Sequence, residues 1–307
     1  MMHPASIQLK IADFIIDLIL PNNVPFILDH GFEGYVITDQ KERPSPIDNK
    51  SVAENTISDL TIRCEIGCSN APKRWQEEIY SAKNGDVALW KIFNTVDGIC
   101  LHVFDSENLT HLQHIAFYQE EEQEWVIFSD LNDHQSLESL RYPMMPLILY
   151  YLSTKTKSLL VHASGVFDGE DGRIFSGFSG VGKSTMAGIW RSLGAEVIND
   201  DRLMLRKIDG RWWMFNTPMY YSDTQKKAKL DFIYLPFHHL ENTYERSNEM
   251  PIVLRFMAHC IQHGYNAKHV QWHLDQVLDL AKEIPFARLG VVPNNDVVTF
   301  IKMHERS

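Results

Sequence analysis

The chain has 307 residues, of which 44% are hydrophobic and 22% charged, with a formal net charge of −11 at pH 7. Such values are typical of a globular protein with one large domain or two ordinary ones. The acidic balance argues against nucleic acid as the main partner, because phosphate backbones bind to basic faces. We find neither signal-peptide features nor an apolar run long enough for a bilayer, which predicts a cytoplasmic protein with no membrane partner.

The four cysteines, Cys64, Cys68, Cys100 and Cys260, are too few for a disulfide framework. Cys64 and Cys68 lie four positions apart, but no second Cys or His pair with zinc spacing follows them. We therefore expect buried or partly buried free thiols.

Residues 1–140 contain several short strand-like segments, which predict a β-rich N-terminal domain. These segments are 7–11, 34–37, 60–64, 87–92, 99–104 and 115–118. Turn residues separate several of them, as in a meander of hairpins. The mostly acidic run 120–124 is typical of a solvated hairpin tip.

Residues 141–307 mix strand-like and helix-like segments, which predicts an α/β domain, with α+β organisation over the whole chain. Apolar residues at helical spacing over 137–152 lead into this domain. Strands are expected at 158–163, 173–176, 195–198 and 286–289, together with a hairpin over 202–215. Helices are expected at 185–193, near 251–263, near 274–283 and from about 295.

A phosphate-binding loop stands between the strand at 173–176 and the helix at 185–193. Its residues follow the G-x-x-x-x-G-K-[ST] pattern: Gly177, Phe178, Ser179, Gly180, Val181, Gly182, Lys183 and Ser184. Where glycines carry no side chain, successive backbone N–H groups can surround a polyphosphate. Lys183 adds a positive charge, and the Ser184 hydroxyl can ligate Mg²⁺. The pattern predicts nucleotide phosphates bound by these residues and Thr185; the alternative is a plain glycine turn.

Two acidic residues, Asp200 and Asp201, are expected where the strand at 195–198 ends. A carboxylate there can hold Mg²⁺ opposite Ser184, and a second one can accept a proton from an attacking hydroxyl. His162, at the end of an apolar strand, could contact the transferred phosphoryl group. The alternatives are a turn or helix-cap pair of aspartates and a hydrogen-bonded structural histidine.

Together these residues resemble the core of HPr kinase/phosphorylase and its relatives, whose fold is shared with phosphoenolpyruvate carboxykinases. His162 precedes Lys183 by 21 positions, and Asp200 and Asp201 follow it by 17 and 18, as in HPr kinases. The resemblance covers about 158–225 well. It implies a P-loop domain with a mixed sheet, ATP and Mg²⁺ as cofactors, and Lys183, His162, Asp200 and Asp201 as catalytic residues. Asp201 matches the usual proton acceptor, although the sequence does not separate the two aspartates.

The chain also departs from HPr kinases. It lacks their later glutamate and arginine segments, and the segment 216–223 looks instead like the Thr-Pro motif of kinase-like homologues from peptide-modification systems. Asp223 could then be a further Mg²⁺ ligand, with a solvated loop carboxylate as the alternative. These departures argue against HPr itself as the substrate.

The sequence thus predicts a kinase that transfers the γ-phosphoryl group of ATP to a hydroxyl, in the first place serine, of a protein or peptide. The alternatives are a nucleotide-binding sensor or scaffold without phosphotransfer and a small-molecule kinase. Relatives are often oligomers, but the sequence identifies no interface. Four histidines, His259, His263, His269 and His273, form two i,i+4 pairs, which fit either polar helix faces or a metal site.

Overall fold

The computed structural model describes residues 6–37, 58–105, 108–261 and 265–306. The chain divides into two compact units, the first formed by residues 1–146 and 218–224 and the second by 147–217 and 225–307. The sequence placed the boundary at 140/141, six residues earlier, and did not anticipate that a short later segment belongs to the first unit.

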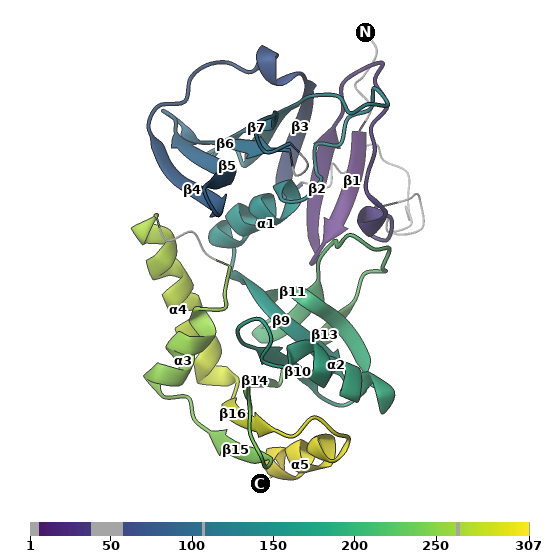
Figure 1. The fold of residues 1–307 in the computed structure, drawn as a ribbon, viewed down its shortest axis with the longest axis vertical. Coiled ribbons are helices and arrows are strands. Elements are labelled where there is room, and N and C mark those ends of the chain that lie inside the picture. Colours follow the sequence, from purple (N-terminus) through teal and green to yellow (C-terminus); the bar gives the residue numbers. More distant parts are fainter. Residues whose placement is uncertain (1–5, 38–57, 106–107, 262–264, 307) are drawn as a thin grey trace, which may run out of the picture. The chain divides into compact units, whose positions relative to one another are not determined.

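The first unit contains an eight-stranded mixed sheet with the strand order β1-β2-β3-β8-β7-β6-β5-β4 (Figure 1). Its strands are β1 Ser6–Ile11, β2 Phe14–Ile19, β3 Leu60–Ile66, β4 Glu78–Asn84, β5 Val87–Asn94, β6 Gly98–Phe104, β7 Leu112–Gln119 and β8 Glu124–Ser129. Two short 3₁₀ helices, His30–Phe32 and Cys68–Asn70, accompany them. The β-rich character expected for these residues agrees with this sheet.

The meander of hairpins describes only part of the sheet. Strands β4 to β8 pair in sequence order and antiparallel, but β3 pairs parallel with both β2 and β8. The segment 34–37, expected as a strand, makes only isolated bridges through Gly34 and Val36. Strands β2 and β4 were missed. In β2 buried and half-buried residues alternate, so Asp17 lies on the half-buried face of the strand, where its Oδ1 accepts a hydrogen bond from Gln8.

The second unit contains another eight-stranded mixed sheet, with the order β13-β12-β11-β9-β10-β14-β16-β15. Its strands are β9 Ser158–Phe167, β10 Gly172–Ser176, β11 Glu196–Ile208, β12 Arg211–Asn216, β13 Lys227–Lys229, β14 Phe232–His238, β15 Thr243–Arg246 and β16 Phe286–Val291. β10, β14 and β16 run parallel, and the other neighbours pair antiparallel.

Five α-helices lie in the described part of the chain: α1 Met144–Lys155, α2 Lys183–Ser192, α3 Met250–Met257, α4 Ala267–Glu283 and α5 Asp296–Glu305. In the second unit, helices cover both faces of the sheet. α3 and α4 contribute Phe256 and Val277 to one buried core, and α2 and α5 contribute Trp190 and Val297 to another. Residues within a strand alternate between the two cores, which gives a three-layer α/β arrangement.

One expected strand end is wrong in a way that matters for function. From the sequence we expected one strand over 195–198 and a new one from Arg202, whereas β11 runs without a break from Glu196 to Ile208. Asp200 and Asp201 therefore lie inside a strand. The reason is non-local: β9 is long enough to pair with β11 on both sides of the aspartates, with one register shift between Val197 and Asn199.

Within the described ranges, no helix is both long and apolar enough to cross a bilayer. The four cysteines are free, with Cys68 half-buried and the other three buried, as the sequence predicted.

Candidate active site

The loop after β10 has the backbone that its glycines suggest. β10 is buried throughout, whereas residues 178–180 are exposed and α2 begins at Lys183. Gly180 and Gly182 have φ of 80° and 102°, the left-handed region that favours glycine. A Cβ added at either position would meet no atom within 4 Å, so open space lies over the loop. A phosphate group could approach the backbone there.

Lys183 is the charged residue of the loop, and it is only 7% exposed. Its Nζ donates to the carbonyl oxygens of Gly177 at 2.8 Å and Phe178 at 3.1 Å. Burial lowers the pKa of Lys183, and the charges of Asp200 and Asp201 oppose this shift. The lysine thus tethers the loop and lies within electrostatic reach of both aspartates.

Ser184 and Thr185 follow Lys183 in the first turn of α2, and both are exposed. The first backbone N–H groups of a helix have no partner inside it, and they carry the positive end of the helix dipole. A phosphate in the loop would therefore meet N–H donors, the Lys183 charge and two hydroxyls from one short segment.

β9 and β11 bring the other predicted residues together. In their antiparallel register Asp200 lies opposite Ser164 and Asp201 opposite Ala163. The Ser164 hydroxyl donates a short hydrogen bond to Asp200 Oδ1. His162 Nδ1 lies 3.2 Å from Asp201 Oδ1. The predicted histidine and aspartates are therefore neighbours in space as well as in the motif.

Asp201 is held from several sides. The contact with His162 is the main cause that lowers the pKa of its carboxyl group; burial acts against it, and Arg202, whose Nη2 lies 3.1 Å from Asp201 Oδ2, adds to the lowering. The backbone N–H of Asp201 donates to Asn199 Oδ1 at 3.1 Å. Asp201 is consequently ionised at neutral pH and restrained in position, as a proton acceptor in phosphoryl transfer has to be.

A second set of hydrogen bonds supports β11 behind the aspartates. Thr217 Oγ1 donates to the carbonyl oxygen of Arg202 at 3.3 Å, and Asn199 Nδ2 donates to the carbonyl oxygen of Thr217 at 3.4 Å. Thr217, singled out by the Thr-Pro segment, thus contacts the strand that carries Asp200 and Asp201. Residues of this kind fix the orientation of those that react.

The residues present fit a magnesium–nucleotide complex better than a metal held by protein alone. In the described ranges no three His, Cys, Asp or Glu side chains are grouped as a metal site. Mg²⁺ typically takes one or two carboxylates together with substrate phosphates and water. Asp200, Asp201 and the Ser184 hydroxyl could supply the protein's share.

Asp223 does not belong to this arrangement within the second unit. It lies in the segment 218–224, which is part of the first unit, and its Oδ1 accepts a hydrogen bond from the backbone N–H of Thr224 at 2.9 Å. The same segment is anchored within the first unit by a hydrogen bond from Ser222 Oγ to Glu33 Oε2 at 3.2 Å. The role of Asp223 as a metal ligand stays a prediction.

Sequence reasoning missed several residues of the site. Ser164 and Arg202 were given no role from the sequence. The register between β9 and β11 places Ser164 opposite Asp200, and Arg202 follows Asp201 directly in the chain. His238 Nε2 lies 3.1 Å from the carbonyl oxygen of Gly180, and no local signal links the two. Of the four histidines considered for metal, His263 lies outside the described residues; His269 and His273 lie on α4, where His273 Nδ1 donates to the carbonyl oxygen of His269.

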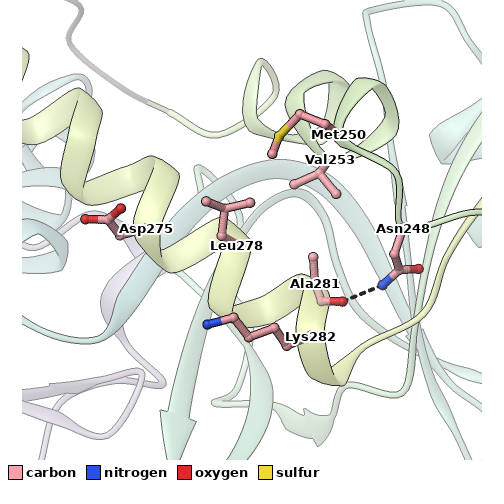
Figure 2. Close-up of a pocket in the computed structure, with 7 residues that line it drawn as sticks. All are labelled: Asn248, Met250, Val253, Asp275, Leu278, Ala281 and Lys282. Atoms are coloured by element: carbon pink, nitrogen blue, oxygen red, sulfur yellow. Dashed lines mark hydrogen bonds between the residues drawn. The ribbon is translucent and has the colours of Figure 1, made fainter.

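A cavity of about 410 Å³ lies apart from the loop, along α3 and α4 (Figure 2). It is lined by Asn248, Met250, Val253, Asp275, Leu278, Ala281 and Lys282. None of these belongs to the loop, β9 or β11, and Asn248 is engaged with the carbonyl oxygen of Ala281. The cavity is therefore separate from the predicted chemistry.

No protein-family model matches the chain, and no curated protein is similar to it. Among solved structures, the Hpr(Ser) kinase/phosphatase from Coxiella burnetii is similar at 10% identity with a TM-score of 0.28. That match covers 48% of this chain and 99% of the other. A score of this size is too low for us to infer anything about function.

Proposed function

We propose that the chain is an ATP- and Mg²⁺-dependent kinase that transfers the γ-phosphoryl group to a hydroxyl, in the first place serine, of a protein or peptide. The observation that carries the proposal is the gathering of four residues: Lys183, which follows β10, His162 of β9, and Asp200 and Asp201 within β11. A protein that only binds a nucleotide needs the loop, but it has no need for an ionised carboxylate held by a histidine next to it.

In the proposed reaction, the loop N–H groups and Lys183 bind and orient the phosphates of ATP. Asp201 accepts the proton of the acceptor hydroxyl as that oxygen forms a bond to the γ-phosphorus and the bond to the bridging oxygen breaks, which leaves ADP. His162 restrains Asp201 and lies near the transferred group. Mg²⁺, when bound by Asp200, Ser184 and phosphate oxygens, would neutralise charge on the phosphates.

Nucleotide binding is the first test. Lys183→Ala should weaken the binding of Mg–ATP at least about tenfold in calorimetry, because it removes a charged donor to the phosphates. Glu196→Gln, an exposed carboxylate on the same strand as the aspartates, serves as the matched control and should bind as the parent protein does. Equal affinity of the Lys183 variant would refute the site.

Phosphotransfer is the second test. With γ-labelled ATP and cell extract, label should appear on a protein or peptide, and Asp201→Asn should keep ATP affinity while it loses about 10²- to 10⁴-fold in rate. If instead Asp200→Asn stops transfer and Asp201→Asn does not, Asp200 is the proton acceptor and Asp201 the Mg²⁺ ligand. Tight binding without any transfer would favour the sensor, and label on a metabolite would favour the small-molecule kinase.

A further inference from the structure

His259 lies beside the phosphate loop without belonging to the motif that identifies it. β9 pairs with β11 along one edge and with β10 along the other. The pairing with β10 ends at Ser176, which lies opposite Ala163. At the next residue of β9 the partner changes, since the backbone N–H of His162 donates to the carbonyl oxygen of His259 at 3.0 Å. The segment containing His259 therefore pairs with β9 at the point where β10 ends and the loop begins.

The imidazole of His259 is buried and has no hydrogen-bond partner among the described residues. The residue is only 7% exposed, and neither ring nitrogen contacts a donor or acceptor. The ring of Phe178, from the loop itself, meets it edge-on with a centroid distance of 4.9 Å. A buried polar atom without a partner is unfavourable, so native proteins rarely keep one unless another group satisfies it in some state.

The ring is neutral at neutral pH. Burial, together with the nearby positive charge of Lys183, lowers its pKa to about 4. A neutral imidazole carries one N–H donor and one acceptor. Beside a lysine and open loop glycines, the partner that best suits this donor is an anionic oxygen.

Phe178 is the group that covers His259, and it is weakly held. Its side chain is 70% exposed, so little packing is lost when the ring turns away. We propose that His259 donates a ring N–H to a phosphate oxygen of the nucleotide, and that Phe178 moves aside to admit this contact. The proposal rests on the proposed function in so far as the loop holds a nucleotide.

Three variants separate this role from simple core filling. His259→Phe keeps the ring volume but loses the donor, and it should weaken Mg–ATP binding about ten- to a hundred-fold, as expected for one hydrogen bond to a charged group. His259→Gln restores a donor and should recover part of the affinity. His273→Phe is the matched control, since His273 is fully buried in the same unit and also has an unpartnered ring nitrogen; its affinity should not change.

A spectroscopic readout completes the test. In protein with ¹⁵N-labelled histidine, the His259 ring N–H signal should move on addition of Mg²⁺ and a non-hydrolysable ATP analogue, while the His273 signal stays in place. If the parent protein binds the analogue but His259→Phe binds equally well and the signal does not move, this inference is overturned and the proposed function stands. If the parent protein binds no nucleotide, both fail.

Discussion

Arg173 provides a quantitative test of how the strand in front of the phosphate loop is held. It lies on β10, three residues before the strand ends, and its side chain is 1% exposed. Its Nε and Nη2 bind both carboxylate oxygens of Glu305 at 2.6 and 2.7 Å, and its Nη1 lies 3.0 Å from Asp168 Oδ2. The guanidinium also stacks over Trp190 of α2, 4.5 Å from the ring centroid. One side chain thus connects β10, α2 and α5.

The expected effect of Arg173→Met depends on the two carboxylates, Glu305 and Asp168, that lose the guanidinium as a partner. Met keeps the apolar stem of the side chain. Glu305, which is 4% exposed, loses both bonds to the guanidinium and keeps the hydrogen bond from the Tyr234 hydroxyl at 2.6 Å. Asp168 keeps Lys302 at 2.7 Å. Removal of one partner of a buried ion pair destabilises proteins by about 3–5 kcal/mol. Against a typical total of about 5–15 kcal/mol, this loss is a substantial share of the stability of the second unit.

Hydrogen exchange of β10 and α5 peptides in urea would measure this loss for the second unit alone. Arg288→Met is the control, because its ion pair with Glu245 at 3.2 Å is partly exposed, with 63% of the Glu245 side chain accessible. Ion pairs open to solvent contribute at most about 1 kcal/mol. The double variant Arg173→Met/Glu305→Gln should be less destabilised than the sum of the single variants, since it leaves no buried unpaired charge. A loss for Arg173→Met no larger than that of Arg288→Met would refute the reasoning.

Two further predictions concern the first unit. His114 is buried, and burial lowers its pKa to about 4, against about 6.5 in the unfolded chain. Its neutral form therefore contributes fully to the free energy of unfolding above pH 6.5, and about 3 kcal/mol of this free energy is lost as the pH falls toward 4. In denaturant titrations at several pH values, His114→Gln should lack this pH dependence. A Cβ at Gly31 would lie 1.5 Å from the carbonyl oxygen of Met219, so Gly31→Ala should release the segment 218–224 to limited proteolysis. Gly188→Ala, where a Cβ meets nothing within 4 Å, should leave the cleavage pattern unchanged.

The features predicted correctly from the sequence are local ones. The helix after the phosphate loop, expected at 185–193, is α2, and Gly194, which follows its end, has a φ of 94°. The hairpin tip at 120–124 between β7 and β8 likewise depends on a few neighbouring residues. Turn and cap preferences act over such short ranges, so one sequence suffices to see them.

What escaped prediction depends on pairing between distant segments. The parallel insertion of β3 between β2 and β8 and the uninterrupted course of β11 are both set by partners far away in the chain. For the same reason His259 could not be assigned to the loop, because its neighbours there, His162 and Phe178, are distant in the sequence. Periodicity reports which face of an element is buried, but not which element lies next to it.

The continuous course of β11 changes how the proposed chemistry is understood. Aspartates at a strand end would sit on a turn, free to adjust when a substrate arrives. Inside β11 their backbone is fixed by the ladder with β9, the strand that also carries His162 and Ser164 and pairs with β10 in front of the loop. Adjacent strands keep a spacing of about 4.8 Å. The distance between the loop that follows β10 and the carboxylates of β11 is therefore set by the sheet. Such preorganisation lowers the reorganisation that phosphoryl transfer requires, and it explains why a spacing of 21 and 17 residues in the sequence can correspond to one fixed arrangement in space.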